Sequence, residues 1–291
     1  MKKRVFDIIE KNKCLKNYCS MHVGGVCKMF CLPHNTKQLI EVLRFSNKNK
    51  TSFFILGNGT NVIFKDSGYD GIVICLNNFQ KIKKTKSGVC VGTGVGLFKL
   101  NTFLAQNNLQ GLEWSYGIPG TIGGAVYMNA GAYENEMGEF VEKVEVIKNN
   151  RKYVIKSKKL HFFYRNSSIK QNNMIITRVW LKLKNGNKAD IVAKQKAYFS
   201  KRKISQPLEF YNSGSIFKKV KDESAGKIID NLGLKNVKIG GAQVSNLHAN
   251  FIINKGEATS QDVIDLIEKI KVEVFQKTGK LLEEEVIIVG D

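Results

Sequence analysis

The stretch GIPGTIGGAVYMNAGA, residues 117–132, places five glycines and one of the chain's three prolines in sixteen positions. A membrane-spanning helix needs larger apolar side chains, about eighteen or more in a row. A flexible linker would not carry Ile118, Ile122 and Val126. The stretch is therefore predicted to be ordered backbone that approaches a neighbour closely. Glycine lacks the Cβ that would keep a neighbour away, and it allows turns with positive φ.

A second glycine-rich loop, GNGTN at 57–61, directly follows the apolar run Phe53–Leu56. It leads into another apolar run, Val62–Phe64, whereas a dinucleotide-binding G-x-G-x-x-G loop must open a helix. A Rossmann fold is therefore disfavoured. Both glycine loops could offer backbone N–H groups to a diphosphate. The alternative, that each loop is only a tight turn, stays open from these residues alone.

The first half of the chain mixes helix and strand signals. Residues 29–56 predict a strand at Met29–Leu32, a helix capped by Asn35 or Thr36, and a strand at Phe53–Leu56. A second helix is predicted over 97–108, where apolar residues recur on one face, namely Leu97, Leu100, Phe103 and Leu104. Further strands are predicted at 62–64, at 72–76, twice within 82–94, and at 141–147, 151–155 and 174–184.

The second half has elements of its own. A lysine-rich helix over 190–203 precedes them, and the candidate boundary lies near Gln195–Lys203. Beyond it we expect a helix near 224–232, a strand in 249–254, a long helix that begins at Thr259 and ends at Gly279, and a last strand in 281–290. The predicted fold class is α+β.

The net charge of +21 is compatible with nucleic acid, an anionic membrane surface or small anionic ligands. The lysines are scattered singly or in pairs, with no RNP-like signature or zinc-finger spacing to concentrate them. A solvated lysine-rich surface is the simpler explanation. No apolar stretch reaches membrane-spanning length and no signal peptide is recognisable, so we expect a soluble cytoplasmic protein.

Six cysteines in 291 residues do not resemble a disulfide framework, so reduced thiols are expected. A metal site with His22 and His34 would lack the usual zinc spacing, and none is predicted. The motifs of P-loops, serine hydrolases and zinc proteases are absent, and only four histidines are present.

Six blocks in order carry a family resemblance: ILGNGTNVIF, GLEWSYGIPGTIGGAVYMNAGAYENEMGE, FFYRNSS, SGSIFK, GGAQVSNLHANFIIN and LLEEEVIIVG. Together they resemble the UDP-N-acetylenolpyruvoylglucosamine reductases of bacterial cell-wall synthesis. The resemblance runs from about Gly24 to the last residues. Six ordered blocks are much more specific than any single motif.

The resemblance implies an FAD-binding domain of the vanillyl-alcohol-oxidase (PCMH) type with a separate α+β substrate-binding domain. The expected ranges are 1–199, in two subdomains of about 1–78 and 79–199, and 200–291, whose C-terminal strand contributes to the active site. The implied enzyme is an oxidoreductase in which NADPH reduces a noncovalent FAD. The reduced flavin then passes hydride to C3 of UDP-N-acetylglucosamine enolpyruvate and yields UDP-N-acetylmuramate. We expect a monomer with small-molecule partners and neither nucleic acid nor membrane.

Three catalytic residues are implied by the resemblance. Arg165 matches the arginine that holds and polarises the substrate carboxylate, a task that suits a guanidinium fork. Ser215 matches the general acid for C2, and Glu285 matches a glutamate that assists there. Without the resemblance, Arg165 would be a surface arginine, Ser215 a turn residue and Glu285 part of an exposed strand end.

Binding residues follow in the same way. The cofactor loops contribute Gly57, Asn58, Gly59, Thr60, Asn61, Gly117, Ile118, Gly120, Gly123 and Gly124. Substrate binding is assigned to Tyr164, Lys203, Lys218 and His248, although a lone histidine such as His248 is more often a structural hydrogen-bonding residue.

The chain departs from the family pattern at several positions. Threonine replaces the usual serine at Thr60, Lys219 replaces an amide side chain, and Glu284 replaces a proline. The chain also lacks the extra tyrosine-bearing segment of the longer family form, so it resembles the shorter form. The change at Lys219 leaves the substrate affinity open.

Two other functions remain in competition. An oxidase of the same FAD fold would be reoxidised by oxygen, and many such enzymes tether FAD through His or Cys, which neither glycine loop contains. A basic nucleic-acid-binding protein would instead show affinity that falls steeply with salt.

Overall fold

The computed structural model describes residues 8–290. The chain forms two compact units. The first holds the described residues up to Glu10, with Phe30–Asn58 and Ile72–Arg202, and the second holds Lys11–Met29, Gly59–Gly71 and the residues from Lys203 onward. Neither unit is a continuous stretch of chain.

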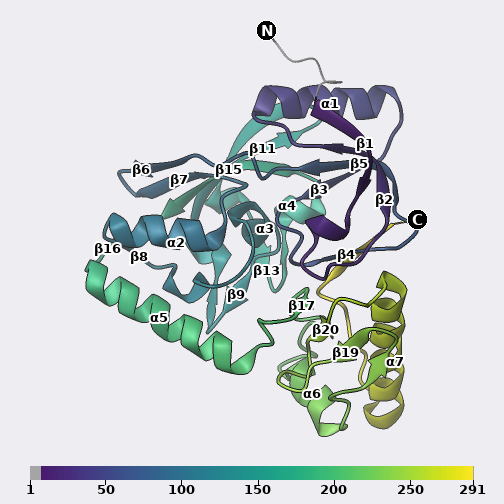
Figure 1. Ribbon diagram of the computed structural model, residues 1–291. Helices are drawn as coiled ribbons and strands as arrows, with labels where there is room; N and C mark the ends of the chain where they lie inside the picture. Colours follow the sequence, from purple (N-terminus) through teal and green to yellow (C-terminus); the bar gives the residue numbers. More distant parts are fainter. Residues whose placement is uncertain (1–7, 291) are drawn as a thin grey trace. The chain divides into compact units, whose positions relative to one another are not determined.

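The central sheet of the first unit is antiparallel throughout, with the strand order β12–β11–β15–β7–β6. Figure 1 labels β11, β15, β7 and β6 of this sheet. Its strands are β6 (Ile82–Thr85), β7 (Gly88–Gly92), β11 (Val141–Lys148), β12 (Arg151–Lys156) and β15 (Ile175–Lys182). The β11–β12 hairpin turns through Asn149 and Asn150, with φ of 50° and 58°. Asparagine tolerates positive φ, which a two-residue hairpin of this type requires.

Two helices belong to the same hydrophobic core as this sheet. The helix α2 (Leu97–Gln106) buries Leu97, Leu100 and Leu104, while Phe103 is half-buried against the same cluster. The predicted apolar face is therefore confirmed. The short helix α3 (Ile122–Tyr127) packs against β15 and β7. The glycine-rich stretch that contains α3 is thus anchored on the central sheet of the unit.

The helix α1 (Thr36–Lys48) begins as predicted, because the side chain of Asn35 accepts a hydrogen bond from the N–H of Gln38. A sheet with the order β1–β2–β5–β3 contains β1 (Ile9–Cys14), β2 (Val26–Cys31), β3 (Phe53–Leu56) and β5 (Tyr69–Cys75). Within the first unit, β3 runs parallel to the Ile72–Cys75 part of β5.

The remaining elements of the first unit are short apart from α5 (Lys188–Ser205), which extends three residues beyond it. They are β8 (Leu109–Gln110), β9 (Gly131–Ala132), β10 (Asn135–Glu136), β13 (Phe162–Phe163), β14 (Asn166–Ser167), α4 (Ser168–Gln171), β16 (Lys184–Asn185), and 3-10 turns at Glu113–Ser115, Met137–Phe140 and Ser157–Lys159.

The second unit has a four-stranded antiparallel sheet in the order β17–β20–β19–β18, against which α7 packs. Its elements are β17 (Tyr211–Asn212), α6 (Ala225–Asn231), β18 (Lys238–Ile239), β19 (Ala242–Val244), β20 (Ile252–Asn254), α7 (Ser260–Thr278) and a 3-10 turn at Lys16–Tyr18. A capping box between Thr259 and Asp262 opens α7, and Gly279 ends it with a φ of 68°.

The C-terminal strand β21 (Ile287–Val289) runs parallel to β4 (Val62–Phe64), which follows the GNGTN loop. Segments that lie 225 positions apart in the sequence are therefore neighbours in this unit. Within residues 8–290, no helix combines the length and the apolar character needed to cross a membrane.

Candidate functional site

The two glycine-rich loops approach each other in the first unit. A Cβ placed on Gly57, the first residue after β3, would lie 2.7 Å from Oγ1 of Thr121. Thr121 is also the N-cap of α3, where its Oγ1 accepts a hydrogen bond from the N–H of Gly124 at 3.3 Å. A larger residue at position 57 would push the loops apart, so Gly57 is needed for their close approach.

The 117–125 loop is held by the segment that follows β7. The N–H groups of Ile122 and Gly123 donate to the carbonyls of Val95 and Thr93 at 2.8 and 2.9 Å. A Cβ on Gly123 would lie 1.8 Å from Oγ1 of Thr93, a distance that no packing can accommodate. Gly123 is therefore required by packing inside the protein, and its N–H group already has an acceptor.

Gly124 differs from its neighbours. It is exposed between buried residues, and the nearest atom to an added Cβ would be Oγ1 of Thr121 at 3.5 Å. Glycine inside a helix is less favourable than alanine by about 1 kcal/mol, and nothing within the described protein requires it here. Free space above Gly124 is what a ligand lying on the first turn of α3 would need.

Gly117 and the residues after it begin the same loop. Gly117 has a φ of +88°, and an added Cβ would lie 2.5 Å from the ring of Phe199 on α5. Ile118 packs against the core cluster, and the carbonyl of Gly120 accepts a hydrogen bond from the N–H of Leu97 at 2.9 Å. The loop backbone is thus fixed at both ends.

The GNGTN loop divides between the units, with Gly57 and Asn58 in the first and Gly59, Thr60 and Asn61 in the second. Gly59 has a φ of +63°, and an added Cβ would lie 2.0 Å from the carbonyl oxygen of Tyr18. Asn61 donates through Nδ2 to the carbonyl of Glu285 at 3.0 Å. Asn58 is exposed and Thr60 half-buried.

Ser215 and Glu285 are brought close in the second unit by backbone pairing. The N–H of Glu285 donates to the carbonyl of Ile216 at 2.8 Å, and Phe217 forms a bridge with Glu284. The segment that carries Ser215 therefore lies against the segment that carries Glu285, although the two residues are 70 positions apart in the sequence.

Asn250 fixes the same segment from its other side. Its Oδ1 accepts from the N–H of Phe217 at 2.9 Å, and its Nδ2 donates to the carbonyl of Phe217 at 2.8 Å. Its own carbonyl accepts from the N–H of Ile216 at 2.9 Å. Asn250 was not among the residues predicted from the sequence. The one available signal was its place in the block NLHANF, two residues after His248.

His248 is held by its own neighbourhood. Its Nδ1 accepts a hydrogen bond from the N–H of Asn250 at 3.2 Å, and its ring meets Phe251 edge-on at 4.7 Å. Burial lowers the pKa of His248, so the neutral imidazole is the form that fits this hydrogen bond. These contacts give His248 a structural role, and its contact with substrate stays a prediction.

The two predicted substrate lysines lie in different settings. Lys218 is paired with Glu283, whose side chain is 73% exposed, and its N–H donates to the carbonyl of Glu283 at 2.8 Å. Lys203 is exposed in the last turns of α5. Where the family usually has proline, Glu284 pairs with Lys271 of α7 at 2.8 Å.

Arg165 and Tyr164 form the two-residue turn of the β13–β14 hairpin in the first unit. Arg165 has a φ of 52°, and its Nη2 donates to the carbonyl of Gly131 at 3.0 Å. Its guanidinium lies 4.9 Å from the centre of the Tyr164 ring, and Tyr164 is 42% exposed. The turn presents one aromatic and one cationic side chain together.

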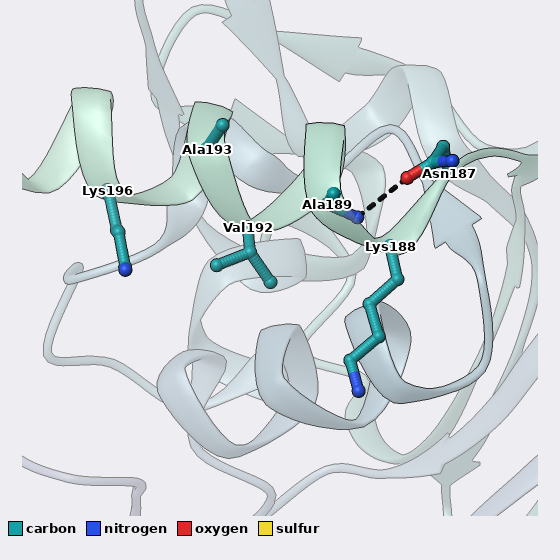
Figure 2. Close-up of a pocket in the computed structure, with 6 residues that line it drawn as sticks. All are labelled: Asn187, Lys188, Ala189, Val192, Ala193 and Lys196. Atoms are coloured by element: carbon teal, nitrogen blue, oxygen red, sulfur yellow. Dashed lines mark hydrogen bonds between the residues drawn. The ribbon is translucent and has the colours of Figure 1, made fainter.

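A surface hollow lies elsewhere, along the first turns of α5 (Figure 2). Its lining residues are Asn187, Lys188, Ala189, Val192, Ala193 and Lys196, and the side chain of Asn187 caps the helix by accepting from the N–H of Ala189 at 2.8 Å. None of the predicted site residues lines this hollow.

Comparison with known proteins decides the family. The family model for the FAD binding domain matches residues 27–155, and the model for the C-terminal domain of UDP-N-acetylenolpyruvoylglucosamine reductase matches residues 206–289. A curated reductase of that name from Caldanaerobacter subterraneus is 38% identical over 96% of this chain and 93% of its own length. The chain belongs to the UDP-N-acetylenolpyruvoylglucosamine reductase family.

Other relatives support the same family assignment. The reductase of Thermotoga maritima is 41% identical over 97% of this chain and 98% of its own length. The crystal structure of the reductase from Thermus caldophilus superposes with a TM-score of 0.83 at 34% identity, covering 96% of this chain and 98% of that one. The predicted α+β fold with an FAD-binding domain is confirmed, and so is the prediction of an FAD-containing oxidoreductase.

The described residues fit FAD. The close approach of Gly57 to Thr121 brings two bare loops together, and the exposed Gly124 leaves room beside them. The N–H groups of Ile122 and Gly123 are already bonded inside the protein, so the other backbone groups of the loops are the ones expected to contact the diphosphate.

Proposed function

We propose that this chain catalyses the NADPH-dependent reduction of UDP-N-acetylglucosamine enolpyruvate to UDP-N-acetylmuramate, with FAD bound noncovalently. One observation on the chain itself carries the proposal: the meeting of the two glycine loops at Gly57 and Thr121, with open space over Gly124. FAD, when bound, supplies the chemistry that transfers hydride from NADPH to C3 of the enolpyruvyl group. A proton is added at C2, so NADPH, one proton and substrate give NADP⁺ and product.

In this proposal Arg165 binds the substrate carboxylate. Hydride addition at C3 places negative charge at C2 and on the adjacent carboxylate, and a planar guanidinium can pair with both carboxylate oxygens. The hydrogen bond from Nη2 to the Gly131 carbonyl and the contact with Tyr164 restrict how the guanidinium can turn. The guanidinium therefore loses less conformational freedom when substrate binds.

Ser215 delivers the proton to C2, and Glu285 assists at the same place. A serine hydroxyl is a weak acid, so the transfer requires a fixed geometry and nearby cations. Backbone pairing between Ile216 and Glu285, with Asn250 behind Phe217, supports such a fixed geometry.

The nucleotide part of the substrate is assigned to Lys203, Lys218, Tyr164 and His248. Lys218 is the best-supported of the cations, because its present partner Glu283 is well exposed and a phosphate oxygen can replace it. We further propose that the enzyme acts as a cytoplasmic monomer in peptidoglycan precursor synthesis, without nucleic acid or membrane partners.

The test is an anaerobic flavin experiment. Purified protein is reduced with NADPH, the enolpyruvyl-UDP sugar is added, and the oxidised-flavin absorbance band is followed. The band should return with substrate in the wild-type protein. In Arg165→Ala and Ser215→Ala, NADPH should still reduce the flavin, but the oxidised-flavin band should not return when the substrate is added. Arg151→Ala, at an exposed position of β12, serves as the control.

The competing oxidase gives a different result. If the band returns only when oxygen is admitted, or if flavin stays with the denatured protein, the proposed activity or the noncovalent cofactor is wrong. Near-normal turnover in both active-site variants would leave the activity in place and overturn the residue assignment.

A further inference from the structure

Arg202 near the end of α5 is a buried cation without a counter-charge. Its side chain lies in the interior, with the residue only 8% exposed. Its Nε is shielded from solvent and has no hydrogen-bond acceptor among residues 8–290. None of the ion pairs within residues 8–290 includes Arg202.

This state is unfavourable in a ligand-free protein. Arginine remains charged at any physiological pH, and removing a charge from water without a partner is unfavourable. Burial lowers the pKa of Arg202, because removal of the guanidinium from water disfavours its charged form. Among the described residues Nε of Arg202 thus has no acceptor and the guanidinium has no carboxylate in an ion pair, and an anion from outside would supply both.

The surroundings indicate which kind of anion. A Cβ on Gly117, at the start of the glycine-rich loop, would lie 3.7 Å from Cδ of Arg202 and 2.5 Å from the ring of Phe199. Phe199 is three residues before Arg202, so both face the loop from the same side of α5. Absence of a Cβ at Gly117 lets the loop backbone approach this pair closely.

Aromatic rings continue along the same part of the first unit. Phe199 meets Tyr116 edge-on at 5.9 Å, and Tyr133 packs on Tyr198 at 4.7 Å. Lys201 lies 5.9 Å from the centres of both tyrosine rings. These groups beside a glycine loop suit a nucleotide. Its phosphate can pair with the guanidinium and the lysine, and its base can stack on the partly exposed aromatic rings.

We propose that Arg202 binds a phosphate group of a nucleotide ligand that approaches over Gly117. The identity of that nucleotide rests on the proposed function, which involves three ligands with nucleotide phosphates: FAD, the UDP moiety of the substrate and NADPH. In each case the guanidinium fork donates hydrogen bonds to two phosphate oxygens, and the phosphate neutralises the buried charge of Arg202.

The test separates these sources by binding and not by turnover. Arg202→Met and Arg202→Lys are compared with Arg151→Met, which changes net charge equally at an exposed position. FAD affinity is measured on the apoprotein by quenching of flavin fluorescence. The affinities for UDP and NADP⁺ are measured on the flavoprotein by perturbation of the flavin spectrum. Thermal unfolding of each apoprotein is recorded in parallel.

Arg202→Met should lower the affinity for one of the three ligands by at least about tenfold, while the apoprotein of this variant is at least as stable as that of the wild type. The ligand that is weakened identifies the source of the phosphate. Arg202→Lys should give an intermediate affinity, because it keeps the charge and loses the fork. Arg151→Met should leave all three affinities within about twofold.

The proposal would be overturned if all three affinities in Arg202→Met stayed within about twofold of the wild type. If the stability of the apoprotein fell at the same time, the side chain would only fill space. If Arg202→Met does not fold, unchanged affinities in Arg202→Lys have the same meaning. Turnover of the enolpyruvyl substrate is scored separately, so failure of the proposed function is distinguishable.

Discussion

Asn250 bonds to both backbone groups of Phe217, donating to its carbonyl at 2.8 Å and accepting from its N–H at 2.9 Å. An asparagine side chain has the same donor and acceptor pair as a peptide group, so it acts here as one more strand residue beside the segment that carries Ser215. The opposite edge of this segment pairs with Glu284 and Glu285. The segment is thus fixed from two sides.

Asn250→Ala should destabilise the protein and misplace Ser215. It leaves the N–H and carbonyl of Phe217, a residue only 2% exposed, without partners, which costs about 1–3 kcal/mol in the free energy of unfolding. Urea unfolding measures the loss. Reoxidation of flavin by substrate should slow more than reduction by NADPH does. Equal slowing of both half-reactions would show that the effect is on overall stability alone.

Gly124→Ala and Gly123→Ala should have opposite effects on the apoprotein. Alanine at 124 meets only Oγ1 of Thr121 at 3.5 Å and improves the helix by about 0.5–1 kcal/mol, so the apoprotein should become more stable. Its affinity for FAD should fall, because the methyl group fills the space that we assign to the cofactor. Flavin titration and thermal unfolding measure the two quantities.

Gly123→Ala is the matched comparison. Its methyl group would collide with Thr93, so this apoprotein should be less stable than the wild type. Unchanged FAD affinity in Gly124→Ala would mean that the free space over Gly124 does not face the cofactor.

Asp262 should contribute to stability against acid. Hydrogen bonds from backbone N–H groups, first that of Thr259 and also that of Gly241, lower the pKa of Asp262 in the folded protein. Stability from this group is therefore present above the unfolded pKa of about 3.9 and is lost as the pH falls through the lower folded value. In Asp262→Asn the acid limb of the stability curve should be shallower, as chemical unfolding between about pH 2 and 6 would show.

His248 should affect stability at milder pH. Because burial lowers its pKa, the unfolded chain takes up a proton first, and folding stability should fall as the pH drops below about 6.5. His248→Asn offers an oxygen in place of Nδ1 as acceptor for the Asn250 N–H. In this variant the pH dependence near about 6.5 should disappear while most of the stability remains. An unchanged pH profile would place the titrating group elsewhere.

Local features were predictable from the sequence because their causes are local. The Asn35 cap of α1, the apolar face of α2 and the Thr259 and Gly279 limits of α7 all depend on residues within a few positions of one another. The site residues Arg165, Ser215 and Glu285 came from family resemblance and not from such patterns, and their roles remain predictions.

What the sequence did not reveal depends on residues far apart. Pairing of Ile287–Val289 with Val62–Phe64, and the hold of Asn250 on Phe217, join segments whose separation carries no periodic signal. Arg202 was missed for the same reason, because its burial and its lack of a partner depend on how α5 packs near Gly117. A lysine-rich helix predicts solvated cations, and it gave no reason to single out one buried arginine.

The hydrogen bonds that hold the glycine loop continue into the core sheet: Gly123 donates to the carbonyl of Thr93, and Thr93 donates to the carbonyl of Thr177 in β15. The conformation of the glycine loop therefore depends on β15, a strand of the core sheet. A random screen for variants that have lost the yellow flavin colour should accordingly return buried positions of β15 alongside the glycines. Those substitutions would weaken FAD binding by displacing the loop and not by removing a contact with the cofactor.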